Sequence, residues 1–385
     1  MIEAATIDEF LVGAVCAVRD GAHAAWPTDA NWDWQSVWLR IEYHGIPILL
    51  HGEQAQLDQW PPALIDRLAE EARLAALWEA THHKCVAQLL EALSQAGIES
   101  VLMKGTALAY LLHDDPATRR RGDTDILIDP KHRDETRSLL KQLGWHRRQD
   151  PHGLYFQEGW LHGAAGMFVH SLDLHWEPSD RPILQEVLSR ARYFEARQPL
   201  SQFGSGAFRG SYAILVLHAV INQKWHACHG YDAEEGRLTS PRRLIWSVDF
   251  DLMANAMDDA DWIELTQLCD AHGVGPLVAE ALLGACDDLN TKVPEGIIDA
   301  LRAQAMNRDI ERNFANSDNL SRFWMDLKAS KGLAQWVRLI GTRALPPRSH
   351  LVEKYPEHQN SPTFILRARM LADTASRVIR KVTSG

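Results

Sequence analysis

Apolar residues follow two different spacings in the first third of the chain. Within residues 61–97 they recur three or four positions apart, which is typical of one face of an amphipathic helix. Residues 101–103 are continuously apolar, and the Lys-Gly-Thr triplet at 104–106 separates them from a second helical pattern. These spacings predict a helix, a short buried strand, a glycine turn and another helix, in that order.

A second strand is predicted at residues 123–128, after a charged loop at 113–122. Side chains alternate across a strand, so Asp123 and Asp125 should project from one face and Thr124 from the other. The two carboxylates therefore face the same side of the predicted sheet.

A third strand is predicted within residues 168–177. Its apolar residues, Leu172 and Leu174, fall on one face, whereas Asp173 and His175 fall on the opposite face. If this strand joins the same sheet, its acidic face can meet the two carboxylates of the preceding strand.

The second half of the chain has a helical pattern almost throughout. We expect an α+β fold, with a small mixed β-sheet core flanked by helices and an α-helical C-terminal domain. Four parts follow: an N-terminal extension of uncertain structure at 1–60, a sheet domain with a helical preface at 61–205, a helical domain at 206–340, and a proline-broken tail with a basic C-terminal helix at 341–385. Inside the extension, the stretch at 42–50 predicts a strand or hairpin.

Composition narrows the class of protein. The chain has 385 residues, of which 46% are apolar and 24% charged, and its net charge is -11. An acidic chain is poorly suited to coating nucleic acid, although a local basic groove stays compatible with it. No apolar run has the length of a membrane span, and the N-terminus lacks the basic region and apolar core of a signal peptide. We expect a cytoplasmic protein with no membrane partner, and free, mostly buried thiols for its five scattered cysteines.

The paired carboxylates indicate a metal site beside a phosphate site. Asp123 and Asp125 repel each other unless a cation lies between them, and oxygen ligands of this kind suit Mg²⁺. Gly105 allows close approach of a phosphate, which the amides at the start of the following helix would bind. A similar pair, Asp249 and Asp251, has no such turn before it and is predicted on a helix, where the carboxylates diverge.

A third carboxylate would complete such a site. Two metals can bind the attacking and leaving oxygens of an in-line displacement. Asp173 would then help to hold the metal nearest the acceptor and to take the acceptor proton; the alternative is a solvent-facing carboxylate on an edge strand. His175 is expected either to orient Asp173, to contact substrate or to make an internal hydrogen bond.

The order of these motifs resembles a known superfamily. A strand, Gly-Thr, a helix, an arginine-rich loop and an Asp-x-Asp strand, with a later third acid, resemble the DNA polymerase β-type nucleotidyltransferases. Residues 102–108 and 119–128 resemble the bacterial "uncharacterised nucleotidyltransferase" family, and the likeness extends from about Gln88 to the tail. The resemblance implies that 61–205 is the catalytic domain. It also implies catalytic and metal-binding roles for Asp123, Asp125 and Asp173, and nucleotide-binding roles for Lys104, Gly105, Thr106 and Arg119.

Several basic and histidine side chains are open to more than one interpretation. Lys104 can reach a phosphate or simply face water at the strand end. Arg120 and Arg121 stand where relatives often carry proline and an apolar residue, so their role is open. His218 is a candidate for a supporting position near the cleft, although core packing or a hydrogen bond between helices is the simpler reading.

The activity implied by the resemblance is Mg²⁺-dependent transfer of a nucleoside monophosphate from an NTP to an unknown acceptor, which is a small molecule, a peptide or a protein hydroxyl. One alternative is a toxin-like transferase that adds nucleotides to tRNA, because the Lys-Gly-Thr-Ala-Leu turn also resembles abortive-infection nucleotidyltransferases; the acidic composition does not favour a nucleic-acid partner. Another alternative is a catalytically idle scaffold, such as an antitoxin, that binds a nucleotide or a partner protein.

Overall fold

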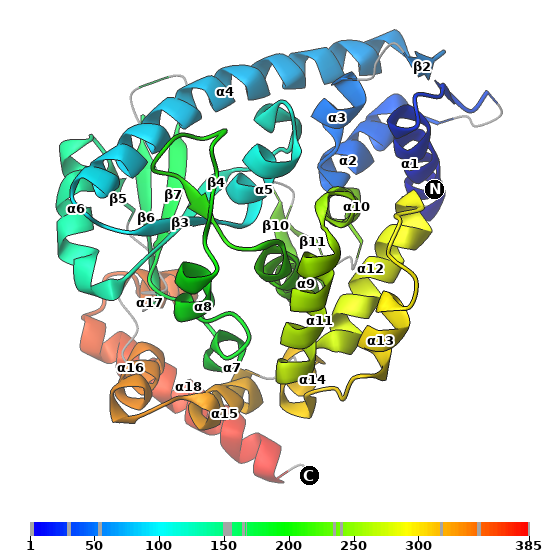
Figure 1. Ribbon diagram of the computed structural model, residues 1–385. Coiled ribbons are helices and arrows are strands. Elements are labelled where there is room, and N and C mark those ends of the chain that lie inside the picture. The colour runs from blue at the N-terminus through cyan, green and yellow to red at the C-terminus, as the bar shows by residue number, and fades with distance from the viewer. Residues whose placement is uncertain are drawn as a thin grey trace.

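The computed structural model describes residues 4–28, 32–52, 56–148, 156–163, 166, 168–233, 236–238, 242–315, 319–344 and 348–383 (Figure 1). The strands are β1 (Ala24–Ala25), β2 (Leu57–Asp58), β3 (Ser100–Met103), β4 (Asp123–Ile128), β5 (His146–Arg147), β6 (Gln157–His162), β7 (His170–His175), β8 (Gln198–Pro199), β9 (Phe208–Arg209), β10 (Tyr231–Ala233) and β11 (Gly236–Leu238). The helices of the first half are α1 (Ala4–Arg19), α2 (Trp34–His44), α3 (Pro47–Gly52), α4 (Pro62–Gln95), α5 (Lys104–Leu112), α6 (Arg133–Gln142), α7 (Pro182–Gln185) and α8 (Arg190–Glu195). Those of the second half are α9 (Tyr212–His229), α10 (Leu244–Ala256), α11 (Asp259–His272), α12 (Gly275–Leu289), α13 (Ile297–Ala303), α14 (Arg308–Ala315), α15 (Asn319–Ala329), α16 (Leu333–Ala344), α17 (Arg348–Lys354) and α18 (Thr363–Thr383).

One mixed sheet forms the centre of the fold, with strand order β5-β6-β7-β4-β3-β9-β8. β3 and β4 pair antiparallel, and β4 pairs with β7 in parallel. The central strands are buried because their cores are continuous apolar runs: residues 101–103 and 126–128 have no exposed surface. The predicted α+β class is therefore confirmed.

The long helix α4 covers one face of this sheet (Figure 1). Its His82 lies with Nε2 2.6 Å from the hydroxyl oxygen of Thr124, on the inner strand β4. Thr124 faces α4, so its neighbours Asp123 and Asp125 face the opposite side, as alternation requires. The sheet thus has a helix-covered side and a side that carries the acids.

The sheet and the helices of the second half share one hydrophobic core. Its buried side chains run from Val86 to Phe314 and include β3, β4 and β7 together with α9, α10 and α12. The predicted boundary near residue 205 falls inside this shared core, and the division into domains stays a prediction.

The N-terminal segment corrects one expectation. Residues 42–50, predicted as a strand or hairpin, form the end of α2 and the start of α3. Gly45, at φ +72°, ends α2 in the left-handed conformation, and Pro47 begins α3. Glycine and proline are common at these two helix positions, so the same residues that signal a turn between strands here connect two helices.

The cysteines only partly follow their prediction. All five are free, but Cys269 alone is buried and Cys228 is exposed. Among the described residues, no helix is both long and apolar enough to cross a bilayer.

Candidate active site

The acids of two sequence motifs and the lysine of a third meet at one end of the central strands. In the ladder between β4 and β7, Asp125 is opposite Asp173, and in the ladder between β3 and β4 it is opposite Met103, directly before Lys104. Directly opposed residues of neighbouring strands point to the same face. The parallel pairing of β4 and β7 is therefore what brings these carboxylates together.

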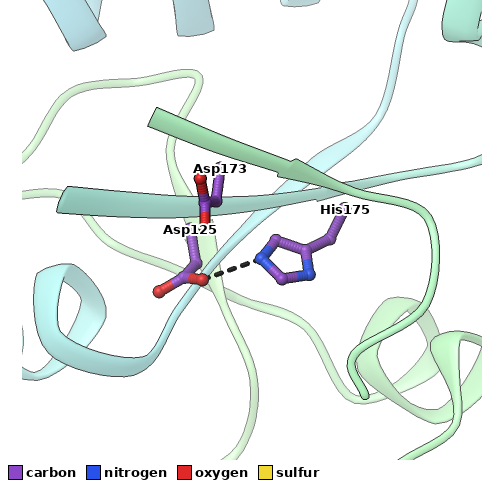
Figure 2. A group of neighbouring side chains, drawn as sticks. All are labelled: Asp125, Asp173 and His175. Atoms are coloured by element: carbon purple, nitrogen blue, oxygen red, sulfur yellow. Dashed lines mark hydrogen bonds and ion pairs between the residues drawn. The ribbon is translucent and has the colours of Figure 1, made fainter. Parts of the chain in front are cut away.

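Asp125, Asp173 and His175 form the closest cluster, with one ligand atom of each within 4.8 Å of the others (Figure 2). The Nε2 of His175 lies 2.8 Å from Oδ1 of Asp125, and both side chains are buried. Burial alone would raise the pKa of Asp125, but Lys104 and His175 hold it below its usual range. Asp125 therefore keeps its negative charge.

Asp173 is held from the other side of the cluster. The Nε2 of Gln157, on β6, donates to Oδ2 of Asp173 at 2.6 Å. Its second oxygen, Oδ1, is buried and accepts no hydrogen bond within the described structure, although a guanidinium nitrogen of Arg148 lies 3.6 Å away. Burial, together with the charge of Asp125, raises the pKa of Asp173.

Asp123 lies at the solvent side of the site, opposite Ser171 in the ladder. It shares a face with Asp125 but is exposed, and it is not part of the closest cluster. The protein packed around its carboxylate and the charge of Asp125 raise the pKa of Asp123. The predicted trio of acids thus lies together on one face, with Asp123 outermost.

Lys104 supplies the cation of this site. Its Nζ lies 2.7 Å from Oδ1 of Asp125. Burial acts against its charge, but the carboxylates of Asp125, Asp123 and Asp173 raise its pKa. The backbone of Lys104 has a φ of +48°, a left-handed conformation that costs a residue with a side chain roughly 1–2 kcal/mol. The ion pair holds the side chain over the acids in spite of that cost.

The glycine-threonine turn differs in detail from the predicted phosphate cradle. The Thr106 hydroxyl is buried and lies 2.8 Å from that of Thr124, on the α4 side of the sheet. At Gly105, a Cβ would lie 3.0 Å from a guanidinium nitrogen of Arg119. Gly105 therefore makes room for an arginine, and Thr106 links the turn to β4.

Arg119, predicted to contact phosphate, is paired with a distant acid. Its Nε and Nη2 donate to the two carboxylate oxygens of Asp249 at 2.7 and 2.6 Å. Asp249 lies on α10, as predicted for the second Asp-x-Asp pair, and Asp251 of that pair instead accepts from Thr291 at 2.8 Å. The phosphate role of Arg119 stays a prediction.

A pocket opens beside the turn, between α5, α9 and α10. Lys104, Gly105, Arg119, His218, Asn222 and Trp246 are among the residues that line it. His218 contacts the hydroxyl of Tyr193 through Nδ1, and burial lowers its pKa to about 3, so its ring is neutral. This pocket is contiguous with the acidic cluster through Lys104.

Two side chains at this site were missed by the sequence-based prediction. Arg148 follows β5, and its guanidinium lies against Gly159 of β6 so closely that a Cβ there would be 2.7 Å from Nε. Gln157 begins β6. Neither lies in a motif; the only signal in the sequence is Gly159, because an isolated glycine in a strand is typical of close approach by another group.

The donor set fits a divalent metal ion. Two carboxylates and an imidazole converge: Nε2 of His175 faces Asp125 (Figure 2), and Oδ1 of Asp173, next to the guanidinium of Arg148, accepts no hydrogen bond within the described residues. Carboxylates suit Mg²⁺ and Mn²⁺, and an imidazole also suits transition metals. Asp125, Asp173 and His175 would be the residues that hold it.

Three comparisons with known proteins bear on this site. A family model described as "Uncharacterised nucleotidyltransferase" matches residues 30–285. The match begins well before Gln88, where the expected resemblance starts, and ends before the tail. No curated protein matches the chain significantly. Among solved structures, an antigenic nucleotidyltransferase-like protein from Paracoccidioides brasiliensis is similar at 16% sequence identity. The match covers 59% of this chain and 95% of that one, and its TM-score of 0.37 means that the two structures differ over much of their length.

Proposed function

The chain belongs to the uncharacterised nucleotidyltransferase family, and on that basis we propose that it transfers a nucleoside monophosphate from an NTP to an acceptor in a Mg²⁺-dependent reaction. The observation that carries the proposal is the convergence of Asp125, Asp173 and His175 beside the glycine turn that begins α5. The proposal includes a relationship to the DNA polymerase β-type superfamily, which rests on the order of the motifs.

The acids are assigned to metal binding. Asp125 and Asp173 contribute oxygens, His175 contributes a nitrogen, and Asp123 extends the site toward the solvent. When bound, Mg²⁺ neutralises phosphate charge and stabilises the charge that develops during transfer. Asp125 is suited to bind a cation because Lys104 and His175 lower its pKa and so keep its carboxylate ionised.

The phosphates are assigned to the basic side of the site. Lys104 lies over the acids, and Arg148 is half-exposed beside Asp173. The amides at the start of α5 add donors that point out of the helix N-terminus. Arg148 is better suited to bind a triphosphate than Arg119, because Nε and Nη2 of Arg119 already donate to the carboxylate of Asp249.

The chemical step needs one proton acceptor. An acceptor hydroxyl oxygen forms a bond to the α-phosphorus while the bond to the bridging oxygen of the pyrophosphate breaks. The hydroxyl proton passes to a carboxylate, and Asp173 is suited to take it because its pKa is raised. The pyrophosphate leaves with the electron pair of the broken bond.

Two alternatives differ in the acceptor or in the activity itself. A tRNA acceptor is disfavoured by the net charge of -11, since RNA binding draws on a basic face. An idle scaffold is disfavoured by the intact set of Asp123, Asp125 and Asp173, because a fold that only binds a partner has no use for three clustered acids.

The test is transfer of label from α-³²P NTPs. The chain is incubated with each NTP, Mg²⁺ and fractions of a cell lysate that contain proteins, RNA or small molecules. Label on one fraction, lost with Asp125→Asn, supports the transferase and identifies the acceptor class. Label on RNA supports the tRNA alternative, and absence of label with every fraction supports the scaffold.

A further inference from the structure

The last 55 residues carry a charge opposite to that of the rest of the chain. Residues 331–385 contain ten lysines and arginines against three acids, a net charge of +7, so the preceding 330 residues carry −18. This segment also lies beyond residue 285, where the family match ends. Charge asymmetry on this scale favours contact with an anionic surface.

Helix α16 turns an apolar stripe toward solvent. Leu333 is 80% exposed, Trp336 42%, Val337 61% and Ile340 44%. Their spacing of three, four and seven positions places all four on one side of the helix. The helix is held by another residue, Leu339, which is 3% exposed. The stripe is therefore a second apolar face, separate from the one that packs.

Helix α18 repeats this arrangement. Its Leu366 and Met370 are buried against Leu351 of α17 and Tyr355, which directly follows α17, in a small hydrophobic cluster of their own. Three further apolar side chains of α18 are exposed, at 71%, 46% and 51%: Phe364, Ile365 and Leu371. Both helices lie at the end of the molecule opposite α4 (Figure 1).

We propose that α16 and α18 form a peripheral docking surface for an anionic lipid bilayer. Helices with leucine, tryptophan and phenylalanine on one side and arginine or lysine on the other bind at the boundary between lipid headgroups and acyl chains. Lys331 lies 3.3 Å from Glu186 but is 81% exposed, and Arg369 contacts His358 while its side chain is exposed, so both cations can still meet lipid phosphates at the surface. This contact lies on the surface of the bilayer and is independent of the transferase proposal. It differs from the expectation of no membrane partner, which no observation contradicts.

Lipid explains the surface better than the other candidate partners do. An RNA surface uses basic groups and stacked aromatics, and the aliphatic members of the two stripes, Leu333, Val337, Ile340, Ile365 and Leu371, would have no function there. An apolar protein partner would bury the stripes but would leave the excess of positive charge without a counterpart.

The test is sedimentation of the full chain with vesicles. Vesicles of phosphatidylcholine alone are compared with vesicles that also contain phosphatidylglycerol, and binding to the second should be at least about tenfold stronger and weaken with added salt. The double variant Leu333→Ser, Val337→Ser should lower that binding about tenfold or more. The matched control is Ile263→Ser on α11, an apolar residue 56% exposed outside the tail, which should bind as the unaltered protein does.

Three results would overturn the proposal. The first is equal binding to both kinds of vesicle, or to neither. The second is equal loss of binding in the double variant and in Ile263→Ser. The third is a stable dimer, or an RNA complex, that the double variant disrupts while vesicle binding stays at background. Circular dichroism of each variant distinguishes lost binding from lost folding.

Discussion

Among single residues, Arg148 gives the sharpest test of where the triphosphate lies. Arg148→Met should raise the KM for NTP by about ten- to a hundredfold, because a charge-assisted hydrogen bond contributes roughly 1.5–3 kcal/mol. The measurement is steady-state transfer with varied NTP, together with thermal unfolding, which should change little because the side chain is 42% exposed.

The adjacent Arg147 is the matched control for that variant. It pairs with Glu158 rather than Asp173, and Arg137 also holds Glu158. Arg147→Met should therefore leave the KM unchanged. An equal rise in both variants would mean that the effect comes from general positive charge, and Arg148 would lose its assigned role.

Lys104 leads to a prediction with two opposite effects. Its ammonium group competes with a metal ion for Asp125, so Lys104→Met should strengthen binding of Mn²⁺ alone. The same change removes a phosphate contact and should weaken binding of the Mn²⁺–NTP complex. Calorimetric titrations of the metal with and without a non-hydrolysable NTP measure both, and weaker metal binding in the variant would contradict the competition.

The residue scale also shows where sequence reasoning succeeds. Alternation of side chains predicts that Asp123 and Asp125 share one face of their strand, and that Asp173 and His175 share one face of theirs. The pairing of β4 with β7 agrees with both predictions. The partners of Thr106 and Arg119 could not be predicted in this way. The residue that Arg119 contacts, Asp249, is 130 positions away, and such pairings depend on packing that no local pattern encodes.

Among elements, the pairing of Arg119 with Asp249 joins the loop before β4 to α10. Both side chains are largely buried, at 12% and 3% exposure. Removing one member leaves an uncompensated charge, so Asp249→Ala should lower the free energy of unfolding by roughly 3–5 kcal/mol. The double variant with Arg119→Ala should cost less than the sum of the two single changes, which urea titrations can measure.

The exposed pair between Lys224 and Glu280 provides the comparison. Its side chains are 30% and 64% exposed, and surface pairs contribute roughly 0–1 kcal/mol. Glu280→Ala should therefore have a small effect. If Asp249→Ala were as mild, α10 would not depend on this contact with the loop.

Apolar periodicity in the sequence predicts the turn after β3 and the helices α4 and α10, and the structure contains all three. It fails at residues 42–50, where a run of nine residues is too short to distinguish two periods. It is also silent on strand order. The parallel pairing of β4 with β7, on which the site depends, follows from the whole sheet and was not predicted; the family resemblance implied only a third acid on a later strand.

For the whole molecule, buried neutral histidines predict loss of stability in acid. Burial lowers the pKa of His82 to about 2 and that of His218 to about 3. The unfolded chain binds these protons near pH 6.5, whereas the folded chain does not. The contribution of each such histidine to stability should therefore be complete above about pH 6.5. Below that pH, the free energy of unfolding should fall by about 1.4 kcal/mol per pH unit for each of them.

The variant that checks this is His82→Gln. It should flatten the decline of unfolding free energy between pH 6.5 and lower values, measured by urea titration at each pH, whereas His146→Gln on the exposed strand β5 should leave the slope unchanged. Identical slopes in His82→Gln and the unaltered protein would contradict the assignment of a neutral buried ring.

The central claim is that Asp125, Asp173 and His175 hold a divalent metal ion, and that an NTP binds to the protein together with this ion. It is tested most directly by electron paramagnetic resonance of Mn²⁺ titrated into the protein. The account predicts saturable Mn²⁺ binding that a non-hydrolysable NTP strengthens. Asp125→Asn or Asp173→Asn should abolish this binding, whereas the folded fraction of Asp249→Asn should still bind Mn²⁺. Mn²⁺ binding that is absent, or that survives both Asp125→Asn and Asp173→Asn, would contradict it.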